Sequence, residues 1–166
     1  ISGLLLNSMG DPITVINKNG DMFISYISVG WEVSVARSIN NGVTWNETLI
    51  FSPSVLGSNY AISDKSYLGI DNRKFKSDGT NNPYYGNLYA AWTVFYSGSN
   101  DGIMFSKSND NGNTWTANNL VTNIDMGRKQ GAIIKTGNNG EVYGCWMSIE
   151  CISNVSSSVD FPPNLR

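Results

Sequence analysis

The chain has 166 residues, 40% of them hydrophobic and only 14% charged, which gives enough apolar surface for one folded domain over residues 1–166 and argues against disorder. A net charge of −2 leaves no basic patch for nucleic acid or an anionic membrane, and no apolar run approaches the roughly 18 residues of a membrane span. Because histidine is absent, imidazole catalysis and histidine-based metal or haem sites are excluded, and no cofactor or metal is expected.

Along the chain, short strands alternate with polar turns, and one seven-residue pattern occurs three times. It consists of a glycine, a polar residue, an aliphatic residue, an aromatic residue, two small or apolar residues and a large aromatic residue, at 20–26, 86–92 and 140–146. Each copy follows a short β-rich run, at 13–16, 67–70 and 132–134. Run, turn and heptad together predict a β-hairpin at each of the three places.

A second pattern follows the first two heptads. Strand-like runs at 33–38 and 103–108 lead into the octapeptides Ser38–Trp45 and Ser108–Trp115, and further runs follow at 48–51 and 119–122. Four short strands per unit is the composition of a propeller blade. No window has helical periodicity. The predicted fold is therefore all-β, a propeller of four-stranded antiparallel blades of which the chain holds about two and a half.

The predicted blades differ in completeness. Two complete blades are expected at 11–52 and 64–122, an incomplete blade at 128–150, and an atypical tail at 151–166. The tail has a serine run and a Pro-Pro pair where a third strand and a third octapeptide would be expected. The extra length of the second blade falls largely within 72–85, which predicts an insertion in a turn.

The octapeptides predict self-closing turns. The side-chain oxygen of Asp110, or of Asn40 in the first copy, is expected to accept hydrogen bonds from main-chain N–H groups two or three residues on. The glycine supplies a positive φ angle, the threonine resumes the strand and the tryptophan buries its ring. We assign this structural role to Ser38, Asn40, Gly42, Thr44 and Trp45, and to Ser108, Asp110, Gly112, Thr114 and Trp115. A calcium loop is the alternative, but the terminal bidentate acid of an EF-hand is missing.

The octapeptides resemble the Asp-box, or BNR repeat, of sialidases and other β-propellers. Ser108–Trp115 matches this motif in full, and Ser38–Trp45 matches it with one Asp-to-Asn change. With the heptads, the resemblance spans about residues 11 to 150. It implies a sialidase-like propeller in which each box joins the third and fourth strands of a blade and lies away from the catalytic face.

The turns opposite the boxes hold the candidate binding residues, because alternate connections of an up-and-down blade share one face. Aromatic rings there can stack on sugars, carboxylates can bind hydroxyl groups, and a guanidinium can bind an anion. The substrate-binding candidates are Trp31, Tyr60, Asp64, Tyr96, Asp101, Asp125 and Arg128, with Glu150 on the same face. The alternative is that these are ordinary loops of an Asn- and Ser-rich secreted protein.

Catalysis is not assigned to any residue. The sialidase chemistry that the resemblance implies needs three converging arginines, a tyrosine nucleophile with a glutamate, and an aspartic acid. Arg37 and Arg73 are expected on the box face and Arg166 is terminal, so only Arg128 falls on the candidate face. If the protein is an enzyme, it is expected to be an exo-sialidase-like glycoside hydrolase, with Asp64 and Glu150, or Asp101 and Asp125, as possible carboxylate pairs.

The sequence thus predicts an extracellular or periplasmic, glycan-directed propeller that binds sugars and, in a complete ring, could hydrolyse them. A non-catalytic scaffold for protein interaction or adhesion is the alternative. An open array of blades leaves apolar faces uncovered, so further blades, self-association or the tail must cover them. Cys145 and Cys151 match no redox or zinc motif, and their thiol state is left open.

Overall fold

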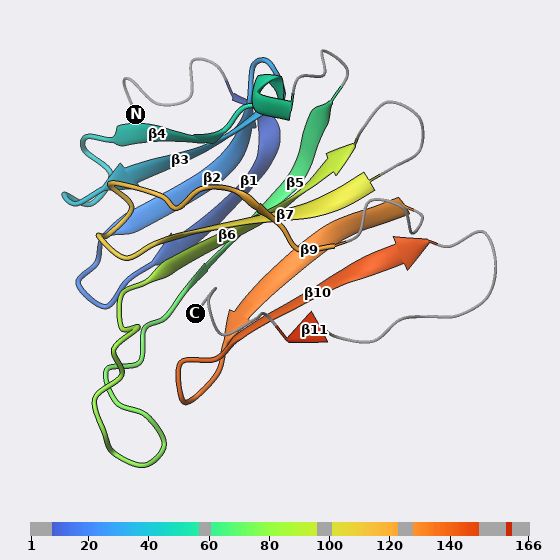
Figure 1. Cartoon of the computed structure of the whole chain (residues 1–166). Coiled ribbons are helices and arrows are strands. Elements are labelled where there is room, and N and C mark those ends of the chain that lie inside the picture. The colour runs from blue at the N-terminus through green and yellow to red at the C-terminus, as the bar shows by residue number, and fades with distance from the viewer. Residues whose placement is uncertain (1–7, 57–60, 96–100, 123–127, 150–158, 161–166) are drawn as a thin grey trace.

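The computed structural model describes residues 8–56, 61–95, 101–122, 128–149 and 159–160, which form three antiparallel β-sheets lying side by side (Figure 1). The first sheet consists of β1 (Ser8–Ile16), β2 (Met22–Ser28), β3 (Glu32–Ser38) and β4 (Asn46–Phe51). The middle sheet consists of β5 (Ile62–Ile70), β6 (Leu88–Phe95), β7 (Asp101–Ser108) and β8 (Asn119–Leu120). The third consists of β9 (Arg128–Thr136), β10 (Val142–Ile149) and β11 (Val159–Asp160).

Each sheet is a meander in which consecutive strands pair. The first strands of the sheets are neighbours, since β5 contacts both β1 and β9, as expected for blades arranged about an axis. The all-β prediction is confirmed, and the one helical element among the described residues is a single 3₁₀ turn, η1 (Pro53–Leu56). No helix in the described part of the chain is long and apolar enough to span a bilayer. The strand β11 was not predicted, because it lies in the serine- and proline-rich tail.

The middle sheet is buried on both faces, and β6 shows why. Leu88, Ala90, Trp92 and Val94 alternate along β6 and pack against the first sheet. Tyr89 and Ala91 point the other way and pack against the third sheet. A strand covered on both sides is a continuous apolar run instead of an alternating one, which is how this segment reads. The core therefore consists of two apolar layers that share the middle sheet.

A β-bulge occurs at the same place in all three first strands. Two residues of each first strand lie opposite the single large aromatic residue that ends the heptad: residues 11–12 opposite Tyr26, 65–66 opposite Trp92 and 131–132 opposite Trp146. The first bulged residue has a positive φ each time, 54° at Asp11, 48° at Lys65 and 71° at Gly131. Bulges of this kind bend a strand and re-aim its side chains. The repeated heptad therefore marks a repeated bend near the axis.

The two octapeptides, which we call the box turns, share one hydrogen-bond pattern. Asn40 Oδ1 accepts from Thr44 N at 2.9 Å, and Asp110 Oδ1 accepts from Thr114 N at 2.9 Å. The bonded N–H is thus four residues on, not two or three as the sequence analysis expected. The serine that opens each turn adds a bond that was not predicted, since its Oγ accepts from the glycine N at 2.9 Å in both copies.

The glycines of the box turns differ in their surroundings, which gives a matched test. Gly42 and Gly112 both have φ of 81°, but a Cβ on Gly112 would meet Phe23 Cε1 at 3.2 Å and Leu88 Cδ1 at 3.3 Å. A Cβ on Gly42 would meet nothing closer than Trp45 at 3.6 Å. We expect Gly112→Ala to lower the free energy of unfolding by about 1 kcal/mol more than Gly42→Ala does, measured by urea denaturation. Equal losses would mean that only backbone strain matters.

Candidate functional site

The turns divide between two ends of the sheets. At the box end, Asn17 in the β1–β2 turn donates from Nδ2 to Asn111 Oδ1 of the second box turn at 3.2 Å. Arg73, in the insertion between β5 and β6, donates from Nη1 to Thr136 O at the end of β9 at 2.9 Å. The opposite end, which we call the loop end, holds the β2–β3 turn and the starts of β5, β7 and β9. The first-to-second, third-to-fourth and inserted turns therefore share one end, as the blade topology predicted.

Four of the sequence-predicted binding residues are described, and all lie at the loop end. Trp31 is in the β2–β3 turn, 42% exposed, and its main-chain oxygen accepts from Ser63 N of the middle sheet at 3.3 Å. Asp64, Asp101 and Arg128 lie at or next to the starts of β5, β7 and β9. The remaining candidates lie outside the described residues: Tyr60, Tyr96, Asp125 and Glu150.

The structure brings Asp64, Asp101 and Arg128 together between the middle and third sheets. Asp101 is only 3% exposed and lies on the face of β7 whose next residues, Ile103 and Phe105, pack against the third sheet. Asp64 Oδ2 accepts from Gln130 Nε2 of β9 at 3.0 Å. We call the set Asp64, Asp101, Arg128, Lys129 and Gln130 the inter-sheet polar cluster. It closes the loop end of the apolar layer between these two sheets.

The electrostatics of the cluster centre on Asp101. Burial raises the pKa of its carboxyl group, and the positive charges of Arg128 and Lys129 oppose that rise. Its Oδ2 and the nearby Thr93 Oγ1 are buried and have no hydrogen-bond partner within the described ranges. Burial therefore disfavours the ionised form of this carboxyl group, and the two neighbouring cations offset part of that cost.

Sequence reasoning missed the neighbours of Asp101. Lys129 is only 5% exposed and its charge acts on Asp101, and Gln130 contacts Asp64. Strict alternation back along β9 from the buried Ala132 and Ile134 would put Gln130, and not Lys129, on the buried face of the strand. The bulge at Gly131 changes that alternation, and its place is fixed by the pairing of β9 with β10.

The described arginines do not converge. Arg37 donates from Nη1 to Asn113 Oδ1 of the second box turn at 2.7 Å, so it lies at the box end with Arg73. Arg166 is outside the described residues. Within the part of the chain that the structure describes, Arg128 is therefore the arginine at the loop end, and three arginines are not brought together there. Cys145 is an exposed free thiol on β10, and Cys151 is not among the described residues.

No protein-family model and no curated protein matches the chain. Solved structures do match. The Hadza microbial sialidase Hz136 superposes on 87% of this chain with a TM-score of 0.65 at 14% identity, and a protein of unknown function from Dyadobacter fermentans on 80% with a TM-score of 0.51 at 12% identity. The chain has a sialidase-like fold. The matches cover 33% and 32% of those two structures, so the chain spans about a third of their length.

Proposed function

We propose that this chain belongs to a glycan-directed propeller and binds an acidic sugar at the loop end. The observation that carries the proposal is Asp101, a carboxyl group buried between two sheets. One of its oxygens has no hydrogen-bond partner among the described residues, and the positive charge of Arg128 acts on it. Burying a carboxyl group without a hydrogen-bond partner costs free energy. Groups that carry this cost are concentrated at binding and catalytic sites. The sialidase-like fold also supports a sugar as the ligand.

The described side chains suit the parts of an acidic sugar. Arg128 is exposed and its guanidinium can bind a carboxylate with two hydrogen bonds. Asp64 and Asp101 can accept from hydroxyl groups, and the exposed ring of Trp31 offers a stacking surface next to β5. Hydrolysis belongs to the proposal only for a complete ring, in which Asp101 would supply a proton and further arginines would complete the anion site.

Binding of the full chain to a glycan array, followed by titration of the sugars that bind, tests this proposal. We expect Arg128→Ala to weaken binding of acidic sugars at least tenfold, because a charge-assisted hydrogen bond contributes about 1.5 to 3 kcal/mol and tenfold is about 1.4 kcal/mol. Asp101→Asn keeps the size of the side chain but removes its acid, and should also weaken binding. Lys18→Ala, which removes one exposed positive charge in the β1–β2 turn, is the matched control.

Binding of acidic sugars that Arg128→Ala leaves unchanged would contradict the assignment of this end. Binding of no glycan at all would favour a scaffold for protein interaction. A fluorogenic sialoside, assayed in parallel with the mass of the protein in solution, separates binding from turnover. Turnover by this chain would extend the proposal from binding to hydrolysis.

A further inference from the structure

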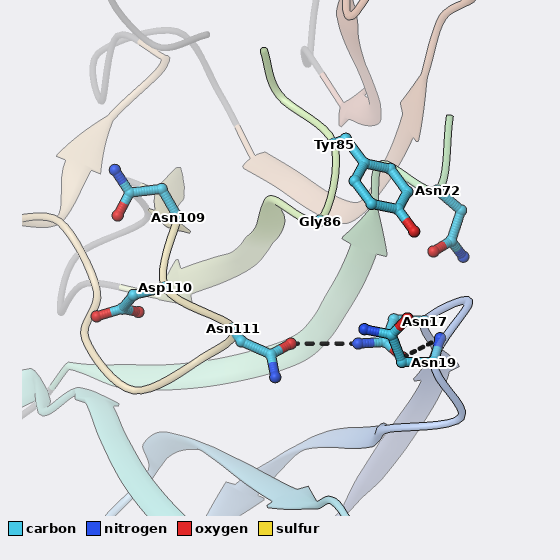
Figure 2. A pocket seen from close by; sticks show the side chains of 8 residues that line it. All are labelled: Asn17, Asn19, Asn72, Tyr85, Gly86, Asn109, Asp110 and Asn111. Carbon is cyan, nitrogen blue, oxygen red and sulfur yellow. Dashed lines mark hydrogen bonds between the residues drawn. The ribbon is translucent and has the colours of Figure 1, made fainter. Parts of the chain in front are cut away.

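A hollow lies at the box end, at the opposite end of the sheets from the inter-sheet polar cluster. It is a cavity of about 340 Å³ formed by three turns, and Figure 2 shows the side chains around it. Its lining comes from the β1–β2 turn, the insertion and the second box turn: Asn17, Asn19, Asn72, Tyr85, Gly86, Asn109, Asp110 and Asn111. The volume is at the lower end of the roughly 300 to 1,000 Å³ of small-ligand pockets.

One wall of this pocket is preformed by hydrogen bonds between the first and middle sheets. Asn17 Oδ1 accepts from the main-chain N of Asn19 and of Asp21, both at 2.9 Å. Asn17 Nδ2 donates to Asp21 Oδ2 at 2.9 Å, and Asn111 Nδ2 donates to the same oxygen at 2.8 Å. These bonds fix Asn17 and Asn111 before any ligand arrives, which lowers the ordering cost of binding.

The insertion that forms the facing wall is also held in place. Its anchor is the fully buried Asp71, whose Oδ2 accepts from Asn82 Nδ2 at 2.8 Å and whose main-chain oxygen accepts from Gly86 N at 2.7 Å. Tyr85 N in turn donates to Asn82 O at 3.3 Å. The backbone that carries Tyr85 is therefore fixed, although its side chain is 38% exposed.

One buried polar atom at the pocket has no hydrogen-bond partner among the described residues, and two exposed polar side chains lie near it. Asn72 donates from Nδ2 to Ile16 O at 3.0 Å, but its Oδ1 is buried and has no hydrogen-bond partner in the described structure. Figure 2 shows the Tyr85 hydroxyl pointing toward Asn72 and the β1–β2 turn, while Asn109 lies on the far side of the hollow. Amides and a phenol offer donors and acceptors together, next to an aromatic ring. This combination matches the hydroxyl groups and apolar faces of a sugar ring.

The charges around the pocket select against anions. Asp110 lines it, and hydrogen bonds from Thr114 and Ser108 lower the pKa of Asp110 to about 2, so its carboxylate is ionised at neutral pH. Asp21 lies directly behind Asn17 and Asn111. The lining contains no lysine or arginine to balance these carboxylates. A carboxylated sugar would be repelled here, whereas an uncharged one would not.

We propose that this pocket is a binding site for an uncharged pyranoside, separate from the acidic-sugar site proposed at the loop end. Three observations carry the assignment: the preformed amide wall, the exposed ring of Tyr85, and the buried Asn72 Oδ1, which has no hydrogen-bond partner among the residues that the structure describes. The lining residues come from the turns of the first two sheets, and the insertion is also anchored to the third sheet by the Arg73–Thr136 hydrogen bond. The existence of the site does not depend on the function proposed for the opposite end.

Saturation-transfer NMR on the full chain, with methyl glycosides of uncharged hexoses and N-acetylhexosamines and with N-acetylneuraminic acid, tests the site. We expect at least one uncharged glycoside to bind with a Kd on the order of 1 mM, the level of weak single-site ligands. Tyr85→Ala and Asn109→Ala should each weaken that binding at least tenfold. Tyr143→Ala, which removes a 51% exposed tyrosine from the third sheet, should leave it unchanged.

The two variants keep the test decisive, because Asn109 is exposed and its replacement does not threaten folding. Binding of an uncharged glycoside that survives both Tyr85→Ala and Asn109→Ala would overturn the proposal, and so would binding of no uncharged glycoside. Arg128→Ala separates the two ends. Binding at the box end should survive it, whereas binding of an acidic sugar at the loop end should not.

Discussion

Replacing Trp92 with alanine is expected to lower the free energy of unfolding by about 3 to 5 kcal/mol, the range measured for large aromatic residues removed from cores. Trp92 is fully buried in the layer between the first and middle sheets, and its ring centroid lies 5.3 Å from that of Phe51. Because β6 is held on both sides by paired strands, the surrounding structure can collapse only partly into the space left behind. The loss is measured by urea denaturation followed by circular dichroism.

Two comparisons make this prediction specific. Trp31→Ala removes the same side chain from an exposed turn and should change stability by less than about 0.5 kcal/mol. Trp92→Phe keeps an aromatic ring and removes the indole N–H, which is buried without a hydrogen-bond partner in the described structure, so it should cost less than half as much as alanine. If Trp92→Ala and Trp31→Ala were equally mild, the two-layer core would be wrong.

Replacing Asp110 with alanine is expected to cost about 2 kcal/mol, because it removes the acceptor of three hydrogen bonds in the second box turn. Asp110 Oδ1 accepts from Ser108 Oγ at 2.8 Å and from Thr114 N at 2.9 Å, and Oδ2 accepts from Thr114 Oγ1. Asp110→Asn should cost less than about 1 kcal/mol. The first box turn already uses Asn40, whose Oδ1 accepts from Thr44 N at the same 2.9 Å.

The same residue predicts a pH dependence. Hydrogen bonds from Thr114 lower the pKa of Asp110 from 3.8 to about 2 in the folded protein, so folding favours the ionised form. Its contribution to stability is complete above pH 3.8 and is lost as the pH falls toward 2. The difference in unfolding free energy between the natural chain and Asp110→Asn should therefore shrink over this range. A difference that stays constant would show that the charge of Asp110 does not contribute.

The strands and the ends of the sheets could be predicted from the sequence because they depend on local pattern. The heptads fix β2, β6 and β10, and the octapeptides fix the turns before β4 and β8. The hydrogen-bond donor to the Asp110 carboxylate was expected two or three residues on, but it is Thr114 N, four residues on. Asn111 and Gly112 both adopt left-handed conformations, which lengthen the turn. Asparagine adopts that conformation more readily than most residues, but its position in the turn is not fixed by propensity alone.

The bulges could not be predicted, and they decide the details of the site. Lys65 has a φ of 48°, a conformation for which lysine has no preference, so only the pairing opposite Trp92 explains it. Asp101 and Arg128 were placed at one end by topology, but the burial of Lys129 and the contact of Gln130 depend on the bulge at Gly131. Side-chain partners across sheets depend on register, which a single sequence does not specify.

The burial of β6 on both faces predicts which backbone amides are most protected from hydrogen exchange. The amides of β6 can exchange with solvent only when both apolar layers separate, whereas β4, β8 and β11 each pair with a single strand among the described residues. Deuterium uptake should therefore be slowest at Leu88–Phe95 and should follow global unfolding there, while the edge strands exchange through local fluctuations. A ligand that bridges two sheets would slow exchange in its own turns first, and this difference in protection would show which end of the molecule it occupies.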